Sequence, residues 1–395
     1  MPPNPPHQPP LAAAQRINAI QRPVIPLIGQ WIKAHPQTIN LGQGMVSYPP
    51  PETLRGAVES FFHDPLNHRY QPAAGIPALT EIIRQKLSHE NGISIGSEQA
   101  LYITAGSNMA FLQAILAIVD SGDEIIILSP YYFNHEMAIR MASGVPVIVP
   151  TDAVHQPQLE LIAAAITPRT RAIVTISPNN PTGAVYSRDT LAAINALCAR
   201  HGLYHISDEA YEYFLYDQVP HLSPASLPHS AAHTISLFSL SKAYAMASWR
   251  VGYMVLPAHL AEAMHKIQDT NLICAPAITQ HAAVAAIKAG RRYCEPYIHQ
   301  LAQTRQQLIT LLANHTLRTV APQGAFYFLI YDDKKSVSDM LQLTHHLITH
   351  HHVAALPGIT FGVEGPCCFR ISYGALDTAS ALEGVSRLIA GIRSL

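Results

Sequence analysis

Hydrophobic and polar positions follow two spacings that alternate along most of the chain. Short apolar runs at 101–104, 124–128 and 145–149 are typical of buried strands, whereas 107–119 and 135–142 have the three- and four-residue spacing of a helix with one buried face. Strands separated by helices predict right-handed crossovers and a mostly parallel sheet covered on both faces. The same alternation continues with helices at 158–166 and 187–200 and strands at 171–176, 203–207, 233–238 and 251–256.

The two ends of the chain depart from this alternation. Residues 258–290 predict helix that leaves the sheet, and short strands at 322–329 and 368–373 with helices between them fit a smaller α+β domain. Near the start, 11–34 is amphipathic and helical, with breaks expected at Pro23 and Pro26. The predicted fold class is therefore α/β, with a large sheet domain and a second, smaller domain.

Composition excludes several classes of partner. The chain has 395 residues and a net charge of -1, from 25 basic and 26 acidic residues, so no basic face is expected for nucleic acid or an anionic membrane. No apolar run approaches the length of about 18 residues that spans a bilayer. The five cysteines form no CxxC pair, which favours free thiols and a cytoplasmic protein. Residues 1–10 contain six prolines and predict a flexible arm.

A histidine cluster near the C-terminus is the one candidate for a metal site. His346 and His350 have the i, i+4 spacing that suits a metal ion on a helix. Neither an acidic residue nor a cysteine accompanies the cluster, so a solvated helix end is the better interpretation. We expect no metal.

The most informative polar stretch lies between the apolar runs at 235–238 and 251–256. It contains Ser239, Ser241, Lys242 and Arg250. A lysine withdrawn from water beside an arginine has a lowered pKa, because burial and a like charge both disfavour the ammonium form. Such a lysine is a nucleophile that forms a Schiff base with a carbonyl. A solvated lysine in a serine-rich turn is the commoner situation, so the choice between a nucleophilic and a solvated lysine depends on other segments.

Further polar groups follow other predicted strands, where α/β proteins bind ligands. Gly106 and Ser107 open a helix and offer backbone N–H groups to an anion, although an ordinary N-cap serine has the same pattern. Tyr132 follows the second strand and either stacks on a planar ligand or lies in the core. Asn180 belongs to a rigid Asn-Pro-Thr-Gly turn, which points its amide into a cleft or lies at the surface. Asp208 ends a buried strand and needs a charged partner, such as a protonated pyridine nitrogen.

Taken in order, four segments resemble the class I and II aminotransferases, which are pyridoxal-phosphate enzymes of fold type I. The segments are Asn-Asn-Pro-Thr-Gly at 179–183, Asp-Glu-Ala-Tyr at 208–211, Ser-Leu-Ser-Lys at 239–242 and Arg-Val-Gly at 250–252. The resemblance covers about residues 40–373. It implies transfer of an amino group from an L-amino acid to a 2-oxo acid by a ping-pong Schiff-base mechanism.

The resemblance also implies a role for each residue around the cofactor. Lys242 would hold pyridoxal 5'-phosphate as a Schiff base and later act as general base. Asp208 would pair with the pyridine nitrogen, Asn180 and Tyr211 with the phenolic oxygen, and Tyr132 would stack on the ring. The phosphate would be bound by Gly106, Ser107, Asn108, Ser239, Ser241 and Arg250. Two features, Ser107-Asn108 and Tyr132, depart from the commonest family pattern.

For the substrate, the resemblance implies that Arg370 binds the α-carboxylate, with Gly44 and Asn180 assisting. It implies a homodimer in which Tyr70 reaches the phosphate of the neighbouring subunit. Relatives selective for dicarboxylates need a second cation, yet 100–139 and 267–287 contain no lysine or arginine, which favours a neutral or aromatic amino acid. The segments 41–51 and 322–327 look like the kynurenine, glutamine and methionine transaminase branch.

The expected organisation follows from the same family pattern. It comprises a Pro-rich arm at 1–10, an N-terminal segment at 11–48 that packs with the small domain, a large cofactor-binding domain at 49–289 and a small domain at 290–395. Two alternatives stay open. A carbon–sulfur β-lyase uses the same lysine and arginine, and a regulatory aminotransferase-like protein keeps the fold without the catalysis.

Overall fold

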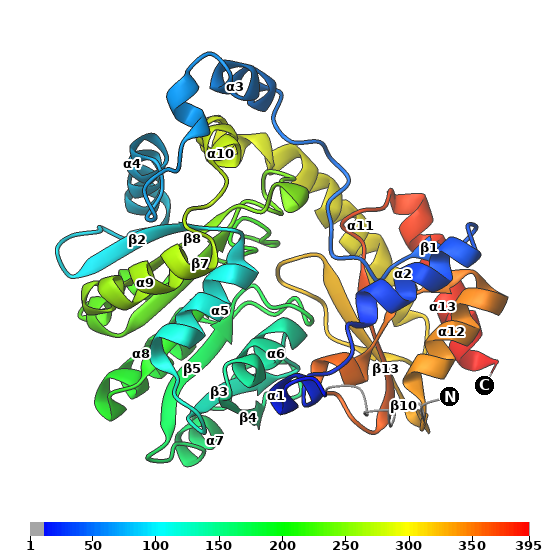
Figure 1. Cartoon of the computed structure of the whole chain (residues 1–395). Helices are drawn as coiled ribbons and strands as arrows, with labels where there is room; N and C mark the ends of the chain where they lie inside the picture. Colours follow the sequence, from blue (N-terminus) through cyan, green and yellow to red (C-terminus); the bar gives the residue numbers. More distant parts are fainter. Residues whose placement is uncertain (1–11, 395) are drawn as a thin grey trace, which may run out of the picture.

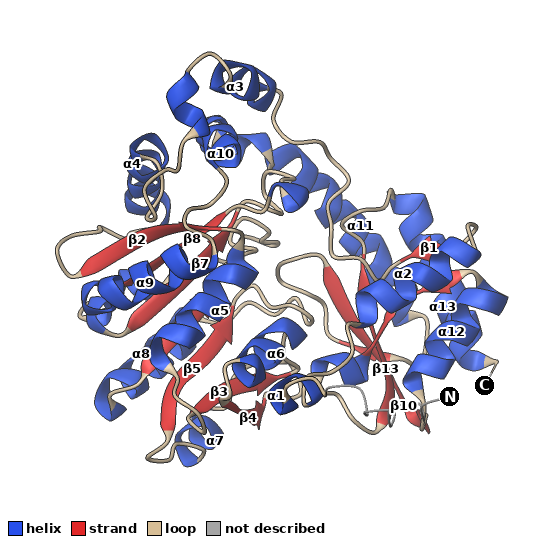
Figure 2. Ribbon diagram, in the orientation of Figure 1, coloured by secondary structure: helices blue, strands red, loops and turns tan. Residues whose placement is uncertain are grey.

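The computed structural model describes residues 12–394. It contains two main sheets that lie side by side, each covered by helices, and a separate pair of short strands (Figure 1, Figure 2). The predicted arm at 1–10 lies outside the described residues. The larger sheet has seven strands and the smaller one four. The α/β class predicted from the alternating spacing is confirmed.

The seven-stranded sheet has the order β2-β8-β7-β6-β5-β3-β4. Neighbouring strands are parallel except where β8 pairs antiparallel with β2 and β7. This reversal matters because Gly252, the first residue of β8, pairs with the last residues of β2 and β7, Thr104 and Ser239. The strands are β2 (Gln99–Thr104), β3 (Glu124–Ser129), β4 (Val145–Pro150), β5 (Thr170–Ile176), β6 (Tyr204–Asp208), β7 (Thr234–Ser239) and β8 (Gly252–Pro257).

Both faces of this sheet are buried, as the near-continuous apolar strands predict. Along β3, Ile125 and Ile127 pack into one core cluster and Ile126 into another, because successive side chains point to opposite faces. The first cluster is closed by α5 (Ser107–Ile118), α6 (Phe133–Met141) and α9 (Ala261–Asn271), and the second by α7 (Leu159–Ala164) and α8 (Arg188–His201).

Three further helices lie beyond the β2 end of the sheet, where α4 and α10 pack on each other and α3 packs on α10 (Figure 1). They are α3 (Thr53–Phe61), α4 (Pro77–Lys86) and α10 (Ala277–Ala289). The single helical stretch expected over 258–290 is interrupted between α9 and α10. Ile273 has a φ of 66°, and Pro276 precedes α10, so the helical hydrogen-bond ladder ends there and restarts.

The smaller region is α+β, as predicted. Its sheet has the order β12-β13-β10-β9 and is antiparallel. The strands are β9 (Arg318–Thr319), β10 (Tyr327–Ser336), β12 (Leu356–Pro357) and β13 (Pro366–Ser372). The helices are α11 (Glu295–Ala313), α12 (Met340–His351) and α13 (Thr378–Arg393), and α11 connects the two regions (Figure 1).

The N-terminal part of the chain joins this C-terminal region. β1 (Ile39–Asn40) pairs in parallel with β11 (Val353–Ala354), and α2 (Val24–Ala34) packs against α12. The break expected at Pro23 separates α1 (Gln15–Asn18) from α2, but Pro26 lies within the first turn of α2. The missing N–H of a proline has no intrahelical partner to lose at that position. The domain boundaries at 48/49 and 289/290 stay predictions.

Among residues 12–394 there is no helix with both the length and the apolar character needed to cross a bilayer. The rings of His346 and His350 stack with centroids 4.3 Å apart at the end of α12. No group of three or more histidine, cysteine, aspartate or glutamate side chains in the described part of the chain is arranged to hold a metal ion.

Candidate active site

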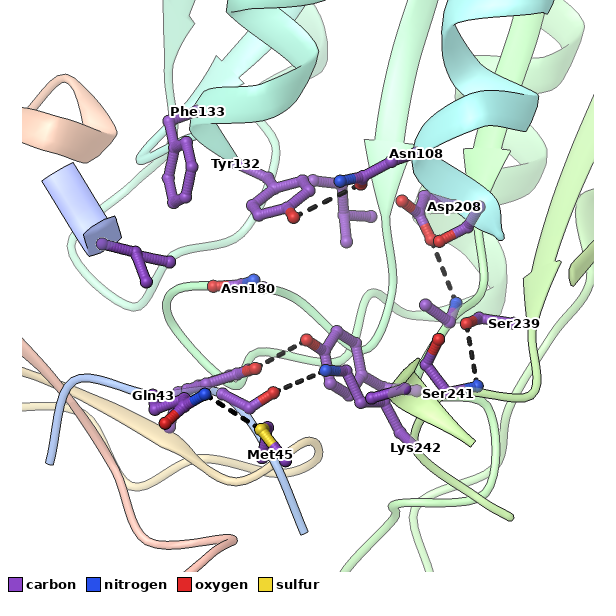
Figure 3. Close-up of a pocket in the computed structure, with 18 of the residues that line it drawn as sticks. Gln43, Met45, Asn108, Tyr132, Phe133, Asn180, Asp208, Ser239, Ser241 and Lys242 are labelled. Atoms are coloured by element: carbon purple, nitrogen blue, oxygen red, sulfur yellow. Dashed lines mark hydrogen bonds between the residues drawn. The ribbon is translucent and has the colours of Figure 1, made fainter. Parts of the chain in front are cut away.

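A cavity of about 230 Å³ lies between the two regions, at the carboxyl ends of β5, β6 and β7 (Figure 3). Every predicted site residue lines it except Gly106 and Tyr70. The predicted residues that line the cavity are Gly44, Ser107, Asn108, Tyr132, Asn180, Asp208, Tyr211, Ser239, Ser241, Lys242, Arg250 and Arg370. The parallel strands explain this convergence, because their carboxyl ends meet at one edge of the sheet.

Lys242 lies in the loop that connects the antiparallel strands β7 and β8, as its flanking apolar runs predict. Its Nζ donates a hydrogen bond to the carbonyl of Gly44 at 2.5 Å. Burial, followed by the positive charges of Arg370 and Arg250, together lower the pKa of this amine from 10.5 to about 8. At pH 7 about a tenth of the amine is therefore unprotonated and able to attack a carbonyl, far more than for an ordinary lysine.

An anion cradle forms where β2 runs into α5. Gly106 has a φ of 85°, and a Cβ on it would lie 2.5 Å from Nη2 of Arg250. Arg250 is itself in the left-handed region, at a φ of 51°, and its Nη1 donates to the carbonyl of Ala247 at 2.9 Å. The first N–H groups of α5 and the guanidinium thus face one space that is open only because residue 106 is glycine. Ser239 accepts a hydrogen bond from the N–H of Ser241 at 3.1 Å beside this space.

Asp208 is buried on the opposite side of the cavity from Lys242 (Figure 3). Its Oδ1 accepts from the N–H of Ala210 at 3.0 Å, and its Oδ2 lies 3.1 Å from Nε2 of His135. His135 is 2% exposed and stacks on Phe111 with ring centroids 3.8 Å apart. Sequence reasoning placed His135 in a helix but missed this contact, although its position one helical turn after Tyr132 was a usable signal.

Arg370 is 2% exposed in the core of the cavity wall. Its Nη1 donates to Oδ1 of Asn180 at 3.0 Å and its Nη2 to the carbonyl of Gly42 at 2.5 Å, while Nε has no partner within the described residues. Burial lowers the pKa of this guanidinium. Among residues 12–394 no carboxylate lies within salt-bridge distance of it. A buried cation that contacts only neutral oxygens is costly, and binding of an anionic ligand offsets that cost.

Comparison with known proteins identifies the family to which the chain belongs. A family model described as aminotransferase class I and II matches residues 36–388. The chain belongs to the class I and II aminotransferases. An aspartate/prephenate aminotransferase of Thermus thermophilus is 36% identical over 328 residues, which are 81% of this chain and 83% of that one.

Other members show the same coverage. Aromatic-amino-acid aminotransferase 2 of Thermococcus litoralis is 33% identical over 341 residues, covering 85% of this chain and 87% of that one. The aspartate aminotransferase of Thermus thermophilus solved with maleate has a TM-score of 0.88 at 31% identity, covering 96% of this chain and 100% of that chain. The predicted family and amino-transfer activity are confirmed, and the carbon–sulfur lyase alternative is not favoured. The predicted likeness to the kynurenine, glutamine and methionine branch stays a prediction.

This aminotransferase depends on pyridoxal phosphate, and its cavity fits that cofactor. The glycine-lined cradle beside Arg250 suits a phosphate, and Lys242 is the amine that would hold an aldehyde. Asp208 is a buried carboxylate that no lysine or arginine of the described residues pairs with, which suits a cationic ring nitrogen. Tyr132 lines the cavity on the same side as Asp208, and its hydroxyl donates to Oδ1 of Asn108 at 3.3 Å (Figure 3).

Tyr211 lies beneath the cavity in contact with a tyrosine that sequence reasoning did not place in the site. The hydroxyls of Tyr211 and Tyr327 are hydrogen-bonded at 2.6 Å, and the guanidinium carbon of Arg370 lies 4.5 Å from the centroid of the Tyr327 ring. Burial raises the pKa of Tyr327 to about 12 and that of Tyr211 well above 10. Both phenols are therefore neutral at physiological pH. One donates its proton to the other, which leaves one O–H free to donate to a ligand.

An apolar part of the cavity wall was also missed from the sequence. Ile25 of α2, Met45 and Phe133 line the cavity, and they come from three separate segments. Ile25 and Met45 are exposed, at 38% and 39%, whereas Phe133 is buried. Ile25 reaches the cavity only because α2 packs against the C-terminal region, so no local motif in the sequence marks it.

Tyr70 does not reach the cavity of its own chain. It is 82% exposed and borders a separate hollow between α3 and α10, near Phe62, His68 and Ile278. This position leaves the expected contribution of Tyr70 to a neighbouring subunit as a prediction.

Proposed function

We propose that the amino donor of this aminotransferase is a neutral or aromatic L-amino acid. The observation that carries the proposal is the set of cations on the cavity wall. Within the described residues these cations are Lys242, Arg250 and Arg370. Each already has a proposed role, in binding the cofactor aldehyde, the phosphate and the α-carboxylate respectively, so none is left for a side-chain carboxylate. The remaining wall contains Ile25, Met45 and Phe133, which suits an apolar side chain. The relatives carry both aspartate and aromatic names, so their names leave the donor open.

The proposed roles divide the cavity among its residues. Lys242 would hold the cofactor through its amine and, once that amine is free, would take the proton from the substrate α-carbon. The cofactor would supply an electron sink at the reacting carbon. Asp208 would keep the ring nitrogen protonated, and Asn180 and Tyr211 would donate to the phenolic oxygen.

The proposed phosphate site is the cradle of Gly106, Ser107, Asn108, Ser239, Ser241 and Arg250. Tyr132 stacks on the cofactor ring. Arg370 binds the substrate α-carboxylate through two parallel hydrogen bonds of its guanidinium. Gly44 and Asn180 lie beside it and assist in binding the carboxylate. The apolar wall then receives the substrate side chain.

We also propose a homodimer in the cytoplasm, with Tyr70 contributed to the phosphate site of a second copy. The exposed Tyr70 and the apolar hollow beside it, which includes Phe62 and Ile278, support a second copy on this face. The cysteines in residues 12–394 are all free, which supports a reducing compartment. Light scattering of the holoenzyme should give twice the chain mass of 43.1 kDa.

The donor is tested by single-turnover absorbance of the holoenzyme without any keto acid. We expect phenylalanine, leucine and methionine to bleach the visible band of the bound cofactor faster than aspartate or glutamate. Lys242→Ala should lack the band altogether. Aspartate as the fastest donor would contradict the proposed substrate class without affecting the assignment to the family.

A further inference from the structure

The segment that carries Tyr70 is held in place by the side chain of Gln268. Gln268 lies on α9 and is fully buried. Its Nε2 donates to the carbonyls of Ala73 at 2.7 Å and Ile103 at 2.6 Å. The amide of Gln268 therefore joins the loop that follows Tyr70 to β2, the strand that leads into the phosphate cradle. It reinforces a direct backbone bond from the N–H of Ile103 to the carbonyl of Ala74 at 3.0 Å.

A second buried glutamine holds the same loop from α10. Oε1 of Gln280 accepts from the N–H of Ile76 at 2.8 Å, and its Nε2 donates to the carbonyl of Ala275 at 2.7 Å. Between the two attachments lies Gly75, whose φ is 115° and whose missing Cβ leaves room for the side chain of Ile103. The path of the loop is thus fixed on both sides of a residue that has to be glycine.

The glutamines also connect to the cradle of their own subunit. Nε2 of Gln113 donates to Oε1 of Gln268 at 2.8 Å, and Gln113 is a fully buried residue of α5. The N-terminus of α5 supplies the cradle. Hydrogen-bonded amides therefore join α5, the helix that begins at the cradle, to the loop that bears Tyr70.

We propose that Gln268 and Gln280 are positioning residues for Tyr70. Within residues 12–394 no side-chain hydrogen bond holds Tyr70, and its side chain is 82% exposed, so the backbone of its loop sets the point from which the side chain extends. The position of the Tyr70 hydroxyl must be fixed closely if it is to bind the phosphate of a second subunit. The inference rests on the proposed cross-subunit role of Tyr70 and adds the residues that make it effective.

The test is a double-mutant cycle on the rate at which the cofactor leaves the dimeric holoenzyme. Holoenzyme is diluted into a scavenger of free pyridoxal phosphate, and the loss of the visible band is followed for wild type, Tyr70→Phe, Gln280→Met and the double variant. We expect each single variant to release the cofactor about tenfold faster, which corresponds to about 1.4 kcal/mol. The double variant should release it no faster than Tyr70→Phe alone, because both changes remove the same contact.

Other outcomes separate the possible failures. Release rates that multiply in the double variant would show that Gln280 only stabilises the fold and would overturn the inference. Wild-type release by Gln280→Met, together with faster release by Tyr70→Phe, would overturn the inference and leave the cross-subunit contact intact. Wild-type release by Tyr70→Phe would overturn the proposed role of Tyr70 and the inference with it.

Two further variants keep the test decisive. If the Gln280→Met variant does not fold as a dimer, Gln268→Met takes its place in the cycle, because it removes the other attachment of the loop. The matched control is Gln99→Met, since Gln99 is also buried on β2 but its amide nitrogen makes no hydrogen bond within the described residues. Gln99→Met should release the cofactor at the wild-type rate, and its effect should be independent of Tyr70→Phe.

Discussion

The guanidinium of Arg370 shares one cavity with the amine of Lys242 and is the stronger of the two charges that, together with burial, lower the pKa of that amine to about 8. Arg370 follows Lys242 by more than a hundred residues and lies on β13, in the other sheet. The residue proposed to bind the substrate therefore also tunes the nucleophile before the substrate arrives.

This relationship predicts the pH dependence of cofactor uptake. The unprotonated amine is the reactive form, so the rate at which apoenzyme captures pyridoxal phosphate should fall about tenfold per pH unit below 8 and level off above it. In Arg370→Met the midpoint should move to higher pH, because a like charge has been removed. Stopped-flow absorbance measures both profiles. Arg318→Met, which removes an arginine paired with Asp333 at the surface, is the control and should keep the wild-type midpoint.

Arg370→Ala should raise KM for every amino acid tested. Removing one partner of a buried charge pair typically costs about 2 to 5 kcal/mol. The sharper readout compares phenylalanine with phenethylamine, which lacks the carboxylate. The wild-type preference for phenylalanine in kcat/KM should largely disappear in Arg370→Ala. An undiminished preference would place the carboxylate contact elsewhere.

Gly106→Ala should weaken cofactor binding by narrowing the phosphate cradle. The added Cβ would stand 2.5 Å from Nη2 of Arg250, and the φ of 85° adds backbone strain of about 1 to 2 kcal/mol. Gly122→Ala is a matched control, because Gly122 has a φ of 88° but no atom within 4 Å of its missing Cβ. Both variants should lose thermal stability, whereas only Gly106→Ala should raise the dissociation constant for pyridoxal phosphate. Equal binding by the two variants would argue against a phosphate at this turn.

Ile25→Arg should shift donor preference toward aspartate. The substitution adds a cation to the apolar part of the wall of the cavity that also contains Arg370. The ratio of kcat/KM for aspartate over phenylalanine should rise about tenfold, since one charge-assisted hydrogen bond contributes about 1.5 to 3 kcal/mol. Ile17→Arg changes an exposed isoleucine of α1 that does not line the cavity, so it should leave the ratio unchanged.

Much of the cavity was readable in the sequence because its residues occur in short local motifs. Lys242, Asp208 and Asn180 each follow a strand whose apolar pattern is visible, and strand ends of a parallel sheet gather at one edge. The interruption between α9 and α10 was not predicted, since the left-handed φ of 66° at Ile273 is rare for a β-branched residue; Pro276 was the local signal for it. The roles of His135 and Tyr327 were missed for a similar reason, because each depends on a contact with a residue distant in sequence.

The sequence by itself determined the class of fold, the family and most of the polar residues that line the cavity, because strand periodicity and turn chemistry act over a few neighbouring positions. Only the tertiary structure decided that Arg370 is buried beside Lys242 without a carboxylate, that Ile25 covers the cavity, and that two glutamines hold the loop of Tyr70. These contacts join positions from about 100 to more than 300 residues apart. Their energies depend on burial and on the close fit of separate elements, which local residue patterns do not encode.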